Sequence, residues 1–412
     1  MRTGNLVLLA LQAASSALAA PTPDAVPSDP SAALAQLEAL GSATLQQVED
    51  DLTTAAKKRT FTPPGTCTLA NLQIRREWST LSSSQKKAYT AAVKCLMSKP
   101  ALTPGSLAPG AKTRFDDFIS THINQTMTIH YTGNFLVWHR YYTWVYEKAL
   151  QVECGYTGTQ PYWNWGLTAL IGLENSPHFD GSDTSLSGNG VVIPNQPDLI
   201  LGVSAGLPAM YLPPGTGGGC VTSGPFVNYT VNMGQAALDV PGGIIISNPA
   251  GPFAYNPRCF KRDLTTAINR MFANASSILN TILPPQNIAD FQMKLQGVPG
   301  SGDIGIHGGG HFSLGGDPGR DFFVSPGDPA FYLHHAMIDR VWWIWQQLNP
   351  STRAQGSSAV AGTRTFLNNP PSDPTSIEDI IEFDFAGSTF GPPRKIKELL
   401  STTSGPFCYA YL

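Results

Sequence analysis

The sequence predicts a mainly α-helical protein: a four-helix bundle with long irregular loops and a few short strands. Apolar residues recur at three- and four-residue spacing in the segments 84–97, 134–153, 264–283 and 329–348. Between these segments the chain is rich in loop-forming residues, with 40 Gly and 34 Pro in the whole sequence, and residues 182–256 show no clear periodicity. We expect the four helices to enclose a site.

The histidines indicate what that site holds. Seven of the eight lie in two short windows, and only His178 lies outside them. A single histidine in an apolar stretch is more often a packed core residue, but metal binding rewards the collection of so many imidazoles. The first window contains His122, His130 and His139, and the second contains His307, His311, His334 and His335.

The ligand types that are absent narrow the choice of metal. The sequence has no C-x-x-C pair, no Glu directly after His307 as in the H-E-x-x-H motif of zinc proteases, and no Asp-rich oxygen-ligand loop. Two sites with three nitrogen ligands each favour a pair of copper ions. The two windows must then meet, which ties residues 115–345 into one core.

Two longer motifs resemble the copper signatures of the tyrosinase and catechol oxidase family. The first is H-x4-F-L-x-W-H-R-x-x-T-x3-E, from His130 to Glu147, and the second is D-P-x-F-Y-x-x-H-x3-D, from Asp328 to Asp339. Each signature fixes six or more positions, and their order and separation also match. The resemblance covers residues 67–350 and is greatest to the short-chain fungal group.

The resemblance implies a dicopper centre that uses dioxygen as co-substrate. It assigns His122, His130 and His139 to the first copper and His307, His311 and His335 to the second, with His334 a neighbour. The activity it implies is oxidation of small o-diphenols to o-quinones with reduction of oxygen to water, with possible action on o-aminophenols. The alternatives are a full tyrosinase that hydroxylates monophenols, a hemocyanin-like oxygen carrier and, from the residues alone, a zinc hydrolase.

Three further residues are expected to shape this site. In relatives that hydroxylate monophenols well, the residue after the first ligand of the second copper is often an asparagine that holds a base water; here it is Gly308, so monophenol action should be weak. By the same resemblance Phe322 should hang over the first copper as a gate. Asp339, four residues after His335 on a helix, is expected to fix that imidazole, although an ion pair with Arg340 is the alternative.

The N-terminal region predicts processing. Residues 1–19 show the early Arg, short apolar run and small residues of a secretory signal peptide. Residues 20–59 are rich in Ala, Pro and acidic groups and end in Lys57, Lys58 and Arg59, so we expect a propeptide removed after Lys58-Arg59, or else an N-terminal arm that stays attached. Residues 60–412 then form one catalytic domain, closed by 351–412 without a lid domain.

The cysteines and sequons fit a secreted chain. Six cysteines follow the signal peptide, which predicts three disulfides, with Cys220–Cys259 the best single pair because both flank Gly- and Pro-rich loop. The sequons at Asn124, Asn228 and Asn274 are glycosylation candidates. The other cysteines are Cys67, Cys95, Cys154 and Cys408.

The charge balance limits the partners. The formal net charge is −3, with 26 basic and 29 acidic residues, so no basic surface is expected for nucleic acid or an anionic membrane. No stretch after the signal peptide is apolar enough to span a bilayer. We expect a secreted monomer or weak dimer whose partners are small phenolic substrates.

Overall fold

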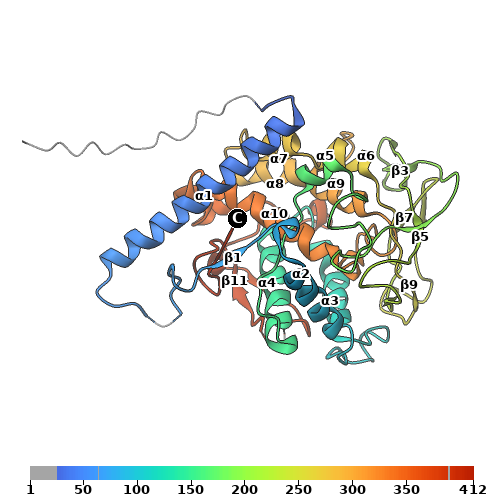
Figure 1. Ribbon diagram of the computed structural model, residues 1–412, viewed down its shortest axis with the longest axis horizontal. Coiled ribbons are helices and arrows are strands. Elements are labelled where there is room, and N and C mark those ends of the chain that lie inside the picture. The colour runs from blue at the N-terminus through green and yellow to red at the C-terminus, as the bar shows by residue number, and fades with distance from the viewer. Residues whose placement is uncertain (1–25, 64, 388–389) are drawn as a thin grey trace, which may run out of the picture.

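The computed structural model describes residues 26–63, 65–387 and 390–412 (Figure 1). The predicted signal peptide lies outside these residues. The described chain is mainly helical, with short strands in pairs, so the predicted fold class is confirmed. The α-helices are α1 (Pro30–Lys58), α2 (Ser83–Leu96), α3 (Arg114–Ile129), α4 (Phe135–Cys154), α5 (Trp165–Ile171), α6 (Thr266–Phe272), α7 (Ala275–Ile282), α8 (Ile288–Gln296), α9 (Gly305–Leu314), α10 (Ala330–Gln347) and α11 (Pro350–Arg353).

The helices that carry the histidine windows are α3, α4, α9 and α10. Only α4 and α10 belong to the four segments with the clearest periodicity; α2 packs outside on α4, and the predicted helix 264–283 is two helices, α6 and α7. The break falls at Asn274, whose side chain accepts a hydrogen bond from the Ser277 amide and starts α7 as an N-cap. Four helices enclose the site as expected, but α3 and α9 take the places of two of the predicted helices.

Local sequence explains where α3 and α4 begin and end. Thr113 and Asp116 form a reciprocal capping box at the start of α3. His130 is the residue that ends α3, and Tyr131 follows in the left-handed region at φ 50°. Gly155 ends α4 in the same region. The sharp turn after α3 therefore brings His130 and His139 back towards His122.

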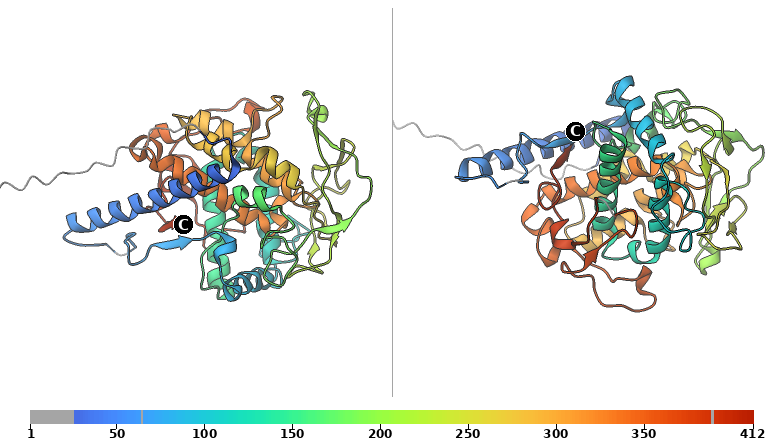
Figure 2. Two further views of the ribbon diagram at one scale, coloured as in Figure 1. Left: turned by 45° about the horizontal axis from the view of Figure 1, so that its top comes forward. Right: turned by 90° about the horizontal axis from the view of Figure 1, so that it is seen from below.

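The loop-rich region forms short two-stranded sheets at one end of the molecule, seen in green and yellow in Figure 2, and two of them, β3–β4 and β7–β8, are hairpins. The pairs are β2–β5, β3–β4, β6–β9 and β7–β8, and the Cys220–Cys259 disulfide predicted from sequence joins β5 to β9. The strands here are β2 (Gly190–Val192), β3 (Leu199–Leu201), β4 (Met210–Leu212), β5 (Gly218–Val221), β6 (Thr230–Val231), β7 (Leu238–Val240), β8 (Ile244–Ile246) and β9 (Arg258–Cys259).

The C-terminal segment is part of the core. Strand β12 (Tyr409–Tyr411) pairs in parallel with β1 (Gln73–Arg75), and β10 (Ile380–Ile381) pairs with β11 (Arg394–Lys395). Tyr409 and Tyr411 are both buried. The other two disulfides, Cys67–Cys408 and Cys95–Cys154, fix this segment to the start of the domain and α2 to α4. The C-terminal segment therefore closes the core and is packed into it.

The sequons differ in their surroundings. Asn124 on α3 and Asn228 are exposed, as a glycan requires. Asn274 is only partly exposed, and its amide also donates to the Arg270 carbonyl while it caps α7, so a glycan there would compete with the cap. Glycosylation at these positions remains a prediction. No helix in the described residues has the length and apolarity needed to cross a bilayer.

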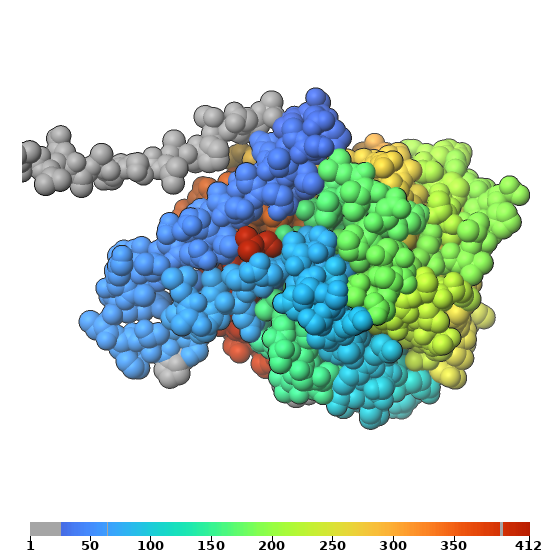
Figure 3. All heavy atoms as spheres, in the orientation of Figure 1, coloured from blue at the N-terminus to red at the C-terminus, as the bar shows by residue number. Residues whose placement is uncertain are grey.

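Helix α1, within the predicted propeptide, packs on the core. Its N-terminal half lies against α5, α7 and α10, its far end projects away, and the C-terminal residues emerge beside it (Figure 3). Glu38 forms an ion pair with Arg340 of α10 (3.4 Å). Gly41 lies so close to Arg340 that a Cβ there would approach its guanidinium to 2.4 Å. The segment is thus an ordered, docked helix, and its cleavage after Arg59 stays a prediction.

We expect Gly41→Leu to loosen this contact. The new side chain would have to displace Arg340 or lift α1, which typically lowers the free energy of unfolding by about 1–3 kcal/mol. Ala56→Leu, at an exposed position near the free end of α1, is the matched control and should change nothing. Thermal unfolding of both variants measures the difference; equal melting temperatures would show that α1 is not docked here.

Candidate metal centre

The two histidine windows meet in the core as two adjacent clusters. The ligand-type nitrogens lie within 4.8 Å of one another inside each cluster, one formed by His122, His130 and His139 and the other by His307, His311, His334 and His335. The clusters also touch: the rings of His139 and His335 stack with centroids 4.3 Å apart. The sequence prediction that the windows form neighbouring sites matches this geometry.

The histidines of the first cluster are oriented by the main chain. The Nδ1 atoms of His122, His130 and His139 donate to the carbonyls of Phe323 (2.8 Å), Thr126 (3.0 Å) and Phe135 (2.8 Å). A proton on Nδ1 leaves Nε2 with its lone pair free, the form that binds a metal. Main-chain oxygens therefore orient the three imidazoles of the first cluster.

Several ring nitrogens have no protein partner. Within the described residues, Nε2 of His122, His139 and His307 is buried without a hydrogen bond, as are both ring nitrogens of His335. A buried polar atom left unpaired costs free energy, and a bound metal would offset that cost. Two groups of neutral nitrogen donors fit a pair of copper ions, because imidazole is a suitable ligand for copper.

Burial keeps these imidazoles neutral. Removal from water lowers the pKa of His130 to about 3 and of His311 to about 4. It lowers the pKa of the other five, including His122 and His335, well below the usual value, and neighbouring histidines add to the effect. The neutral form is the ligand form, so the core holds the rings ready for metal.

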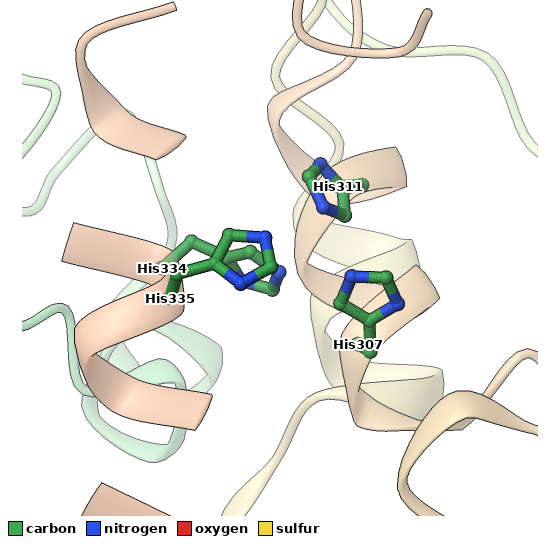
Figure 4. Close-up of side chains that lie close together, drawn as sticks. All are labelled: His307, His311, His334 and His335. Carbon is green, nitrogen blue, oxygen red and sulfur yellow. The ribbon is translucent and has the colours of Figure 1, made fainter. Parts of the chain in front are cut away.

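His334 lies closer to the second cluster than its predicted role as a neighbour suggests. Figure 4 shows His334 and His335 both projecting from α10 towards His307 and His311. The His334 ring lies 4.4 Å from that of His311, and both its nitrogens are unpartnered within the described residues. It also packs on Trp165, 5.1 Å away. Geometry alone thus leaves both His334 and His335 as candidates for the third ligand of the second metal.

The glycines of α9 allow close helix contacts. A Cβ at Gly310 would lie 2.3 Å from the His334 ring, and one at Gly309 would lie 2.7 Å from Phe272 of α6. Each glycine costs about 1 kcal/mol relative to alanine in a helix. Here that cost is offset by bringing His307 and His311 against α10. Gly308 is different, because it faces a cavity and a Cβ there would meet only Ile304, its own helical neighbour, at 2.9 Å.

The aromatic residues around the clusters fall into two groups. Phe135, Trp138, Phe331 and Tyr332 are buried packing residues, and Phe331 lies 4.2 Å from the His335 ring. Phe322 is partly exposed and lies over His130, with ring centroids 4.6 Å apart. Its role as a gate stays a prediction.

Asp339 does not have the role expected from its spacing. Its Oδ1 accepts from Arg140 Nε (2.5 Å), and its Oδ2 accepts from the hydroxyls of Tyr409 (2.7 Å) and Tyr411 (2.5 Å). No described residue donates to or accepts from the His335 ring. The prediction that Asp339 fixes this imidazole is therefore wrong, and so is the alternative pair with Arg340. The carboxylate points to the opposite side, where two tyrosine hydroxyls donate to it and the guanidinium groups of Arg140 and Arg75 (3.5 Å) compensate its charge.

A cavity of about 230 Å³ opens on both clusters. It is small for a ligand pocket, which suits a single ring. Three of its lining residues are proposed ligands, and most of the rest come from loops or helix ends that no sequence pattern singled out. The lining consists of His130, Tyr131, Asp239, Gln296, Ile304, His307, Gly308, His311, Phe312, Gly319, Arg320, Asp321, Phe322 and Ser325.

The eighth histidine is separate. His178 is buried beside Glu77, whose carboxylate lies 2.8 Å from its Nε2. Burial acts to raise the pKa of Glu77, but the interactions of its carboxylate with His178 and Ser79 outweigh burial and lower the pKa. This histidine is a structural residue, as its position outside the windows indicated.

A helical core that gathers two adjacent all-histidine clusters under a small cavity defines a protein built to hold two metal ions. Residues 112–348 match the common central domain of tyrosinase, more than half of the chain. The chain belongs to the tyrosinase family.

Two similar proteins support this family assignment. Tyrosinase-like protein orsC of Emericella nidulans is 43% identical over 310 residues, 74% of this chain and 81% of its own. Tyrosinase P of Aspergillus terreus is 39% identical over 339 residues, 82% and 91% of the two chains.

A solved structure extends the comparison to the whole fold. A polyphenol oxidase variant from Thermothelomyces thermophila superimposes with a TM-score of 0.82 at 42% identity, over 91% of this chain and 97% of that one. Residues 60–412 are 353 of the 412 residues, about 86%. The match therefore extends into the segment before Thr60, where α1 lies.

Copper content should separate the two candidates for the third ligand. We expect His335→Ala to lose at least one of two bound copper ions, because His335 stacks on His139 between the clusters. His334→Ala should keep both, because its ring packs on Trp165. Metal analysis of the purified variants by mass spectrometry measures this. Copper lost from His334→Ala but kept by His335→Ala would exchange the assignments.

The metal-free protein should be sensitive to acid. In the unfolded chain the imidazoles take up protons below about pH 6.5, whereas in the folded chain their lowered pKa values resist this. The free energy of unfolding should therefore be highest above pH 6.5 and fall as the pH falls towards 4. Burial raises the pKa of Asp239 and of Asp321 to about 6 and also raises the pKa of Asp116, which acts in the opposite direction, but these are three groups against seven.

Thermal unfolding from pH 7.5 to pH 4.5 measures this dependence. The copper-loaded protein is the control, because a metal-bound nitrogen cannot take up a proton until the metal leaves. A melting temperature of the metal-free protein that does not change over this range would contradict the burial of neutral imidazoles.

Proposed function

We propose that this protein is a copper-dependent catechol oxidase that converts o-diphenols to o-quinones and reduces dioxygen to water, with weak action on monophenols. The observation that supports it most is the cavity, which reaches His130, His307 and His311 and has Gly308 in its wall. Two copper ions bound there would supply the electron transfer between the diphenol and dioxygen. His122, His130 and His139 would hold one, and His307, His311 and His335 the other.

The chain's own groups position the substrate. Phe322 and Gly308 both line the cavity, so a flat ring can lie between the Phe322 side and the open wall at Gly308. The loop of Phe322 is fixed, because the Phe323 carbonyl accepts from His122 and the Asp321 carboxylate accepts from the Phe323 and Val324 amides. Orientation of the ring is the main contribution expected of the protein.

Gly308 accounts for the preference for diphenols. A phenol with a pKa near 10 arrives protonated at neutral pH, and a glycine offers no side chain to hold a base water. Asp303, one possible partner of such a water, pairs with Lys294 (3.1 Å) and does not line the cavity. Gln296 does line it, but its Oε1 already accepts from the Tyr131 amide (2.8 Å). Of these two groups, Gln296 is thus the one within reach.

Monophenol hydroxylation is the second candidate, favoured by the 39% identity to tyrosinase P. Formation of a coloured quinone from catechol would exclude an oxygen carrier. We also propose that the protein is secreted, because its three disulfides are typical of an oxidising compartment.

Initial rates on 4-tert-butylcatechol and tyrosol test the preference. The parent protein should oxidise the diphenol much faster, and equal rates on the two would contradict the proposal. Gly308→Asn should raise the monophenol rate relative to the diphenol rate by roughly tenfold, since a well-placed base contributes at least that much.

Gly308→Ala is the matched control for this variant. It introduces the same Cβ contact with Ile304 (2.9 Å) but no amide. The ratio of the two rates should stay at the parent value in this variant. An equal rise in both variants would assign the effect to the shape of the wall rather than to a held water.

A further inference from the structure

An acidic residue far from the copper signatures lines the substrate cavity. Asp239 belongs to β7, a strand of the loop region (Figure 1), and shares the cavity wall with Phe322, Arg320 and His311. Its position is fixed by the backbone: Leu238 forms a bridge with Asp321, and Arg320 Nη1 donates to the Asp239 carbonyl (3.4 Å). The residue is therefore held beside the Phe322 loop.

Asp239 is the carboxylate of this wall that has no partner in the protein. No described residue donates a hydrogen bond to its side chain or pairs with it, although Arg320 is near enough to act on it through space. Burial raises its pKa to about 6, so it is still ionised at neutral pH. A half-buried carboxylate without a protein partner keeps only part of its hydration, so a cationic group in the cavity would compensate its charge.

The other two charges of the wall are already compensated. Arg320 forms a buried ion pair with Asp263 (2.8 Å). The Asp321 carboxylate accepts from the main-chain amides of Ala236 (2.7 Å) and Phe323 (3.0 Å), among others. The remaining unpaired charge on the wall is thus negative.

A second cavity of about 190 Å³ continues from this point. Asp239 and Arg320 line both cavities, so the two adjoin at these residues. The second cavity also contains Lys261, while its two other carboxylates are paired, Asp263 with Arg320 and Asp317 with Arg258 (2.7 Å). A short polar arm on a ring in the first cavity would therefore lie beside Asp239.

We propose that Asp239 forms a subsite for a positively charged arm of the phenolic substrate, so that the protein favours catechols with a short alkylammonium chain over uncharged or acidic ones. This proposal rests on the proposed function, because it names the substrate class of the same site. An ammonium is a compact donor that can replace the missing partner of the carboxylate. An acidic arm would meet the unpaired charge and be repelled.

Three catechols of equal arm length test the proposal: dopamine, hydroxytyrosol and 3,4-dihydroxyphenylacetate carry a positive, neutral and negative arm. The parent protein should show the highest kcat/KM for dopamine. Asp239→Asn should lower the dopamine to hydroxytyrosol ratio by roughly fivefold, the upper end for a half-exposed ion pair. It should also improve the acidic substrate. Because no hydrogen bond to this side chain is lost, the variant should fold normally.

Glu382→Gln is the control, since it removes the same charge from an exposed residue that does not line either cavity. Its three ratios should equal those of the parent. A dopamine ratio unchanged in Asp239→Asn would overturn the proposal. A parent preference for the acidic catechol would also overturn it and would assign the subsite to Arg320 or Lys261.

Binding separates this proposal from the proposed function. If the parent protein does not oxidise hydroxytyrosol, the proposed function fails, but calorimetric titration of the copper-loaded protein with tyramine and tyrosol without oxygen still tests Asp239. Tyramine should bind more tightly than tyrosol, and Asp239→Asn should remove the difference. Equal affinities in the parent protein would overturn the subsite.

Discussion

The ion pair between Arg140 and Asp339 is the interaction on which the rest of the centre depends. Arg140 follows His139 on α4, and Asp339 lies one turn after His335 on α10, so the pair fixes the two helices that carry stacked ligands of different clusters. A buried ion pair is stable only when its remaining hydrogen-bonding groups are satisfied. Tyr409, Tyr411 and the Leu400 carbonyl satisfy them, and all three come from the C-terminal segment. The metal centre and the end of the chain therefore form one unit.

The histidine clusters set a second constraint, which lowers the stability of the core that the ion pair helps to hold together. The fold buries six of the seven imidazoles and leaves His311 partly exposed, keeps them neutral and leaves several nitrogens unpaired. Such an arrangement is unfavourable by itself, because buried polar groups without partners lose their hydration. Packing around the clusters and the disulfides stabilise the core enough to hold it, and bound metal would supply the missing interactions.

Ligands and selectivity come from different parts of the fold. Helices hold the histidines, where packed side chains allow little movement. The wall of the cavity comes from loops, with Phe322 and Arg320 after α9 and Asp239 from the hairpins. Loops tolerate substitution better than core helices do, so related chains can change the substrate without disturbing the metal site. Selectivity in this protein should accordingly be sought in β7 and the Phe322 loop.

The sequence by itself determined the helical class, the two histidine windows, the Cys220–Cys259 disulfide and the positions of Phe322 and Gly308 in the site. The class, the windows and the disulfide follow from spacing and composition along the chain, whereas the places of Phe322 and Gly308 follow from the resemblance to the family. Tertiary structure decided which helices enclose the centre. The glycines of α9 leave this helix without a clear apolar periodicity in the sequence, and only the close approach of Gly310 to His334 shows why they are needed. Tertiary structure also decided the partner of Asp339 and the place of Asp239, since residues distant in sequence become neighbours only through packing.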